Sequence, residues 1–204
     1  MGLSKIDIAN QGLVLVGANT IASFSDNNTE SKVANQLYES TLKNLLTKAR
    51  WRFASKQAQL SKSSTDPLDK WDAAYQIPTD ALLIHTVTVA DKVIEYDRYN
   101  EYLYTDTNTS DTVICHYTYQ PHENEFPEYF VQCLVFELAS LFAGAIARND
   151  NLSMLYQKRA VRQLQQARSS ESQTQTTRRL STSLLIEVRN RGTATGITAT
   201  VPSS

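Results

Sequence analysis

Apolar residues recur at helical spacing in three stretches of the chain, which predicts three long helices. The first covers residues 25–52, with Asn27 as a candidate N-cap and Glu30 three residues later, as in a capping box. The second covers residues 128–148 and is apolar almost all round, which is typical of a buried central helix. The third runs from about residue 152 past residue 167.

The third predicted helix has two different faces. One face is apolar and consists of Leu152, Leu155, Tyr156, Leu164 and Ala167. The other face carries basic and glutamine side chains, namely Lys158, Arg159, Arg162, Gln165, Gln166 and Arg168. We expect the apolar face to pack on the other helices.

Between the first and second helices the pattern changes to short runs rich in Thr and Tyr, which favours strands. Strands are predicted at residues 82–89, 93–96, 99–104 and 112–119. The polar pair Asp91 and Lys92 separates the first two, so they should form a hairpin. We infer a small antiparallel sheet inserted between helices.

The predicted fold class is therefore α+β: an antiparallel helical bundle of about three long helices, an inserted small antiparallel β-sheet domain and an extended C-terminal tail. The first helix and the N-terminal segment occupy residues 1–54, and the β domain residues 55–122. The remaining helices occupy residues 123–175, and the tail residues 176–204.

The predicted tail holds a short apolar run, Leu184, Leu185 and Ile186, between stretches rich in Ser, Thr, Gln, Gly and Ala. An apolar peptide on a polar tether cannot bury itself alone. It either docks on a partner by strand addition or groove binding, or folds back onto its own domain. The sequence leaves both alternatives open.

Composition places the chain among foldable proteins. It has 204 residues, of which 41% are hydrophobic and 20% charged, and its formal net charge is −1. These values exclude collagen-like, disulfide-scaffold and disordered classes and disfavour a general duplex-binding protein, which needs a dominant basic surface. Charge is nevertheless uneven, because acidic residues far outnumber basic ones in residues 61–130, whereas basic residues outnumber acidic ones from Arg148 onward. Either the two ends meet different partners or both charged stretches are ordinary solvated faces, and both interpretations stay open.

The sequence contains none of four common catalytic or nucleotide-binding motifs, namely GxxxxGK[ST], GxGxxG, HExxH and GxSxG. Cys115, His116, His122 and Glu123 are close in sequence, but the first two are neighbours in a predicted strand and should face opposite sides. We therefore expect no metal, no cofactor and no enzymatic activity.

The cysteines suit a reducing compartment, and the most apolar stretch suggests a buried helix of a soluble protein. Cys115 and Cys133 form no CxxC pair and are expected to be free thiols. No secretory signal is visible. The apolar stretch at residues 131–147 contains Gln132 and Glu137, so we interpret it as a buried helix rather than a membrane span.

Tyrosine is the one enriched residue type that suggests a surface function. Six of the ten tyrosines fall in the predicted sheet: Tyr96, Tyr99, Tyr102, Tyr104, Tyr117 and Tyr119. They are either a protein interface or ordinary strand tyrosines, and both interpretations stay open. Base stacking is disfavoured because this segment is acidic.

Four segments, in their order and spacing, resemble phage head-to-tail adaptors. They are the GLVLVG run at residues 12–17, IASFSDN at 21–27 with Glu30, ARWRFA at 49–54, and WDAAYQIP at 71–78 followed by Asp80 and Leu82. Over about residues 10–170 the chain resembles the tail tubular protein A family of short-tailed (podovirus) phages.

The resemblance implies a structural virion protein without enzymatic activity, assembled in the host cytoplasm and located in the virion tail at the portal vertex. Members form a ring, typically of twelve copies, between the portal protein and the tail nozzle, tail tubular protein B. Tail fibres are a further expected partner. Genomic DNA passes through the channel without specific binding, and no membrane is involved.

On this interpretation two sets of residues make contacts. Portal docking is assigned to Arg178, Arg179, Leu184, Leu185 and Ile186. Contacts between subunits or with the nozzle are assigned to Tyr96, Tyr99, Tyr102, Tyr104, Arg159 and Arg162.

The alternative is a nucleic-acid-binding module. It would use the basic C-terminal helix and its continuation, namely Arg159, Arg162, Arg168, Arg178 and Arg179.

Overall fold

The computed structural model describes residues 3–64, 67–68, 70–108 and 111–173. The chain divides into two units, residues 1–172 and 173–204. The described residues form four α-helices and seven strands in two antiparallel sheets, so the fold is α+β. The expected bundle of about three long helices with one small sheet is therefore wrong: there is a further helix, and the strands divide between two sheets.

The additional helix is α1, Lys5–Leu15. Ser4 caps its N-terminus: the Ser4 hydroxyl accepts from the Asp7 N–H at 3.2 Å, and the Asp7 carboxylate accepts from the Ser4 N–H at 2.9 Å. The helix has only 11 residues, and apolar side chains lie on most of its sides. Its periodic signal is therefore weak.

The first predicted helix is α2, which is shorter than expected and spans Thr29–Thr47. Asn28, not Asn27, is the N-cap, and its side chain accepts from the Ser31 N–H at 2.7 Å. Glu30 does not complete a capping box, because it is only two residues after the N-cap Asn28; its carboxylate instead accepts from the Asn19 side chain at 3.2 Å.

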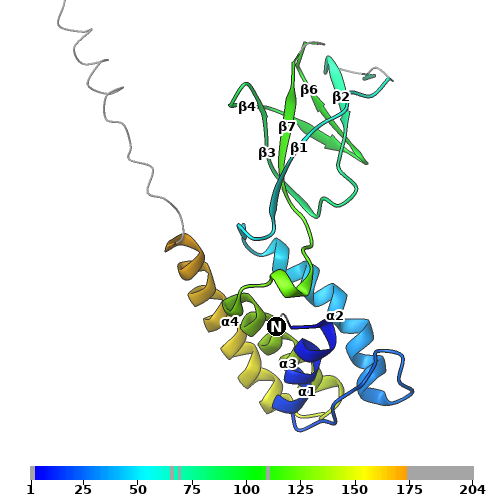
Figure 1. Cartoon of the computed structure of the whole chain (residues 1–204), viewed down its shortest axis with the longest axis vertical. Coiled ribbons are helices and arrows are strands. Elements are labelled where there is room, and N and C mark those ends of the chain that lie inside the picture. Colours follow the sequence, from blue (N-terminus) through cyan, green and yellow to red (C-terminus); the bar gives the residue numbers. More distant parts are fainter. Residues whose placement is uncertain (1–2, 65–66, 69, 109–110, 174–204) are drawn as a thin grey trace, which may run out of the picture. The chain divides into compact units, whose positions relative to one another are not determined.

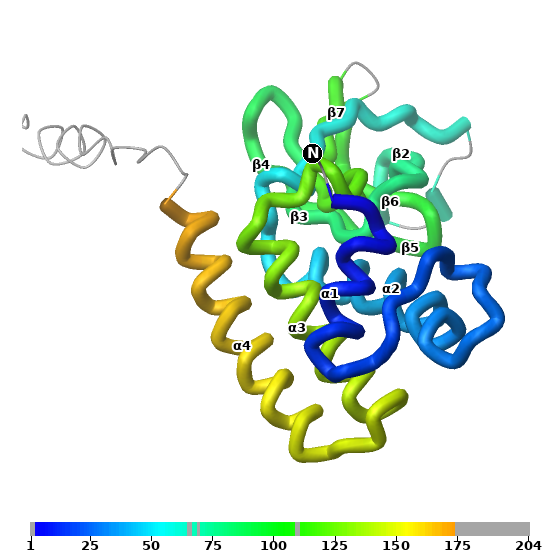
Figure 2. The backbone as a smooth tube through the Cα atoms, turned by 60° about the horizontal axis from the view of Figure 1, so that its bottom comes forward, coloured from blue at the N-terminus to red at the C-terminus, as the bar shows by residue number. Residues whose placement is uncertain are grey.

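Helix α3, Glu128–Ala145, is the central buried helix that the sequence predicts. Ten of its residues are buried, and it packs against α1 and α2. It is also the one described helix that is long and apolar enough to cross a membrane by length and composition alone. Figure 2 shows it lying between α1 and α4.

Helix α4, Asp150–Gln173, starts where Asn149 accepts from the Leu152 N–H at 3.1 Å. Tyr156 and Ala167 of its predicted apolar face are buried, and Leu152 and Leu164 pack against the same core. Leu155 is 44% exposed, so its assignment to the inward face is wrong. Leu155 precedes the buried Tyr156 by one residue, which is a rotation of about 100° around the helix. It therefore lies at the border between the apolar and the basic face.

The first sheet has the strand order β1-β7-β3-β4 and the second has the order β2-β6-β5. Figure 1 shows β7 between β1 and β3. The strands are β1 Ser55–Gln59, β2 Ala73–Gln76, β3 Leu83–Val89, β4 Lys92–Ile94, β5 Asp97–Tyr99, β6 Tyr102–Thr105 and β7 Val113–Thr118.

Two turns define the strand boundaries. The predicted hairpin at Asp91 is confirmed, because Val89 pairs with Lys92. The single predicted strand at residues 99–104 is wrong: Asn100 adopts a positive φ of 53°, and the chain reverses there so that β5 pairs with β6. Asn tolerates this left-handed conformation, and a composition-based strand signal does not register it.

The helices and the strands have separate apolar cores. The helical core gathers the buried side chains of α1, α2 and α3 with Trp51. The β core gathers Tyr75, Val87, Leu103, Cys115, Tyr117 and their neighbours. Cys115 and Cys133 are buried free thiols, one in each core.

Candidate interaction surfaces

The residues assigned to portal docking lie outside the described part of the chain, which ends at residue 173. They are Arg178, Arg179, Leu184, Leu185 and Ile186. Their role stays a prediction.

The four tyrosines assigned to contacts do not share one environment. Tyr99 is 54% exposed and meets Tyr104 edge to face, with ring centroids 5.3 Å apart. Tyr102 is half-buried opposite Tyr99 in the strand register. Tyr96 instead packs against the β core, and burial raises the pKa of its hydroxyl.

Tyr99 and Tyr104 line a pocket of about 310 Å³ together with Trp71 and Lys70. The Lys70 ammonium lies 4.5 Å from the centroid of the Trp71 ring and 3.3 Å from the Asp97 carboxylate. The Trp71 indole N–H is buried and has no hydrogen-bond partner in the described structure. Such a pocket, apolar on its walls and charged at its rim, is typical of protein interfaces.

Sequence reasoning missed Lys70 and Trp71 as parts of this pocket, and Asp97 as the partner of Lys70. One signal points to Asp97: it lies two residues before Tyr99, so both side chains project from the same side of β5. Trp71 comes from a segment about thirty residues earlier, and only the pairing of β2 with β6 places it near the tyrosines.

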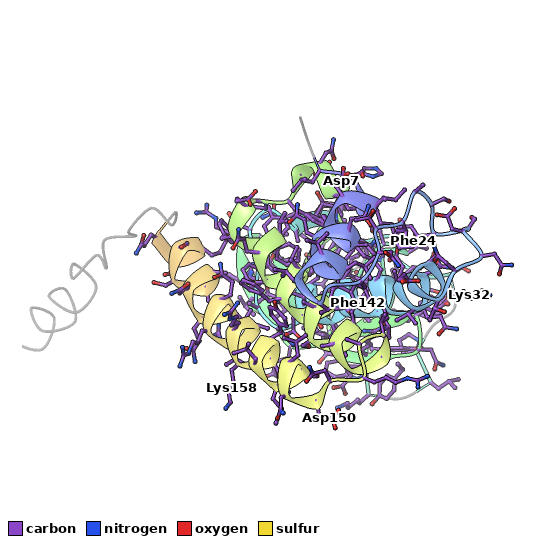
Figure 3. All side chains as sticks on the ribbon, turned by 90° about the horizontal axis from the view of Figure 1, so that it is seen from below. Asp7, Phe24, Lys32, Phe142, Asp150 and Lys158 are labelled. Atoms are coloured by element: carbon purple, nitrogen blue, oxygen red, sulfur yellow. The ribbon has the colours of Figure 1, made fainter. Side chains whose placement is uncertain are left out.

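Helix α4 presents its basic side chains outward. Lys158, Arg159, Arg162 and Arg168 are all exposed. Figure 3 shows Lys158 pointing away from the neighbouring helices. The Arg159 guanidinium carbon lies 5.5 Å from the centroid of the Tyr156 ring. Three apolar side chains are exposed on the same helix: Met154 at 52%, Leu155 at 44% and Val161 at 52%.

A groove of about 630 Å³ runs between α1 and α3. The sequence analysis missed it because α1 was not predicted. The Ser4-to-Asp7 capping box is the signal that could have revealed the helix. The groove is lined by Leu3, Asp7, Asn10, Gln11, Val14, Leu15, Gln132, Val135 and Phe136.

The histidines and cysteines of the β part do not gather. Cys115 is buried, whereas its neighbour His116 lies at the surface with Gln57, with 3.2 Å between Nδ1 and Nε2. His85 Nε2 lies 2.8 Å from the Thr118 hydroxyl, and burial lowers its pKa. Within the described residues, no group of three His, Cys, Asp or Glu side chains is placed to hold a metal ion.

No family model matches the chain, and no curated protein matches it.

Proposed function

We propose that this chain is a structural head-to-tail adaptor of a short-tailed phage virion. Copies form a ring, typically of twelve, between the portal protein and the tail nozzle, and the genome passes through it. The ring assembles from chains made in the host cytoplasm and stays in the virion tail at the portal vertex. The proposal starts from the four segments that resemble the tail tubular protein A family.

The observation that carries the proposal is the packing of the ARWRFA segment at residues 49–54. Trp51 is fully buried, and its indole N–H donates to the Leu45 carbonyl at 3.0 Å. The rings of Trp51 and Phe53 both meet Phe130 edge to face, with centroids 5.2 and 4.9 Å away. Because Ser55 begins β1, this cluster anchors the chain where it leaves the helices for the strands.

The segment that leads from β7 back to the helices contacts the same region of the helical part. The Tyr119 N–H, one residue beyond β7, donates to the Ala54 carbonyl at 2.9 Å. The Gln120 side chain donates to Glu39 of α2 at 3.2 Å. Both ends of the β insertion are therefore held at one site of the helical part. This arrangement suits a subunit whose helices build a ring wall while its strands reach other components.

Two of the other quoted segments also supply specific contacts. Gly12 in α1 leaves so little space that an added Cβ would lie 3.2 Å from the Phe142 ring of α3. Tyr75 in β2 is buried, with its hydroxyl 2.9 Å from the Thr107 hydroxyl. Gly12 thus allows α1 and α3 to pack closely, and Tyr75 joins two segments of the β part. Both segments have structural roles, as expected of a structural virion protein.

The test is association with portal rings encoded by the same genome, measured as native mass. A ring-sized increase in the mass of the portal is expected with the full chain. Deleting residues 180–204 should abolish this increase and leave the circular dichroism spectrum and unfolding temperature unchanged. Undiminished binding after the deletion contradicts the assignment of the tail to portal docking, and no binding by the full chain contradicts the adaptor function.

The exposed basic row on α4 favours a second candidate, a nucleic-acid-binding module. It predicts DNA affinity that falls steeply with salt, because phosphate contacts release counterions. Substituting Arg162 and Arg168 by Gln should then reduce the salt slope. Tight, salt-sensitive DNA binding without portal association would favour this candidate over the adaptor.

A further inference from the structure

The groove between α1 and α3 has the chemistry of a site for a helix. Its walls are largely apolar, and Val14, in its lining, is 60% exposed. Its polar members are Asp7 and amides, with no cation among the lining residues. Hydrogen bonds from the Ser4 hydroxyl and backbone lower the pKa of Asp7, so this carboxylate is charged at neutral pH. Grooves of this kind accept amphipathic helices.

The outward face of α4 is complementary to that groove. Met154 and Val161 lie seven residues apart, and so on one side of the helix, and each is 52% exposed. Lys158 lies between them, and Arg168 follows two turns after Val161 on the same side. This face therefore presents apolar side chains flanked by cations, as the groove presents apolar walls beside a carboxylate.

The two surfaces of one chain cannot meet each other. The opposite side of α4 is already held against the same helices: the Tyr156 hydroxyl donates to the Leu15 carbonyl at 2.7 Å, and its ring stacks on Phe136 with 6.3 Å between centroids. Met154 and Val161 lie about 160° and 140° from Tyr156 around the helix. They therefore face away from α3, beside which α4 lies in Figure 2.

We propose that the outward face of α4 of one copy docks in the α1/α3 groove of the next copy. The contact is head-to-tail, because two different surfaces meet, and repeating it yields a closed ring or a filament. The inference deepens the proposed function and rests on it for ring closure. Its test uses the purified full chain alone, so a failure here is distinct from a failure to bind a portal.

Cysteine cross-linking captures the contact even if it is weak. The chain carrying Val14→Cys and Val161→Cys is treated with a short bismaleimide. Both introduced thiols are exposed, whereas the native Cys115 and Cys133 are buried, and burial raises their pKa values to about 11 and about 12. The expected product is a ladder of covalent oligomers beyond the dimer. Each single-cysteine chain can form no species above a dimer.

A matched control moves one cysteine to another exposed helix. Lys32 lies at the start of α2 and points outward in Figure 3, so the chain with Lys32→Cys and Val161→Cys should give no ladder. Adding Lys158→Glu to the Val14→Cys/Val161→Cys chain should reduce the ladder several-fold, because it sets a carboxylate against Asp7. A missing ladder, an equal ladder from the Lys32→Cys control, or a ladder unaffected by Lys158→Glu overturns the proposed contact.

Discussion

The Tyr129 hydroxyl of α3 donates a hydrogen bond to the carboxylate of Glu171, near the end of α4. The other oxygen of that carboxylate accepts from the Arg52 N–H at 2.6 Å. Glu171 is only 7% exposed, so its carboxyl group is buried between the C-terminal end of α4, α3 and the start of the β insertion. Its hydrogen bonds offset the cost of removing a polar group from water.

Replacing Glu171 by Ala should lower the free energy of unfolding by about 1–3 kcal/mol, because the Tyr129 hydroxyl and the Arg52 N–H lose their common acceptor. Tyr129→Phe removes one of these bonds and should cost about 1 kcal/mol. Urea unfolding measures both values, and amide exchange should accelerate in the last turns of α4.

Gln166→Ala is the control for this pair, since Gln166 is exposed on the same helix and its substitution should change stability by less than about 0.5 kcal/mol. Equal stabilities of the Glu171→Ala and Gln166→Ala chains would contradict a stabilising role for the buried carboxylate.

Two helical glycines should respond in opposite directions to a larger side chain. Gly12 faces Phe142, and Gly12→Val should destabilise the protein by about 1–3 kcal/mol through overpacking. Gly144, near the end of α3, has no atom closer than 4.0 Å to an added Cβ, so Gly144→Ala should stabilise it by up to about 1 kcal/mol. Thermal unfolding distinguishes them. A Gly12→Val chain as stable as the parent would show that α1 and α3 separate more easily than their packing implies.

Alkaline pH should destabilise the fold through its buried tyrosines. Burial, together with a hydrogen bond to Asp80, raises the pKa of Tyr117 from its ordinary 10.0 to about 12. Burial likewise raises the pKa values of Tyr38 and Tyr129. All three hydroxyls ionise first in the unfolded chain, so their contribution is complete below pH 10. The contribution of Tyr117 is lost as the pH rises through 12.

Absorbance at the phenolate band measures this effect. A titration of the native protein should leave a fraction of the tyrosines un-ionised until the chain unfolds, whereas in denaturant all ten should titrate together near their ordinary pKa. Tyr117→Phe should flatten the loss of stability between pH 10 and 12. Simultaneous ionisation of every tyrosine in the native state would argue against their burial.

The thiols provide a separate probe of the two cores. Cys133 belongs to the helical core and Cys115 to the β core. Both should resist a water-soluble thiol reagent in the native state and react at the rate of a free thiol in denaturant. Mass spectrometry after partial denaturation reports which core opens first. Rapid labelling of either thiol in the native protein would contradict its burial.

The tyrosines show how far sequence reasoning reaches in the candidate site. Their enrichment in strands is visible in the sequence, and the prediction of an exposed contact is consistent with the exposure of Tyr99. The same pattern assigns Tyr96 an equal role, yet it packs against the β core. The alternation of side chains along a strand predicts that neighbouring residues face opposite sides of the sheet. It does not predict which side is covered by the rest of the β core.

Local signals in the sequence predict three features of the fold: the apolar helix α3, the two-faced pattern of α4 and the hairpin of β3 and β4. The remaining features depend on contacts between residues that are distant in the chain. Strand β1 has the polar sequence SKQAQ and exists because its backbone pairs with β7, fifty-nine residues away between Gln57 and His116. The α1/α3 groove likewise depends on how closely Gly12 lets two helices approach. Backbone pairing and helix approach join distant residues, and no local pattern encodes such distances.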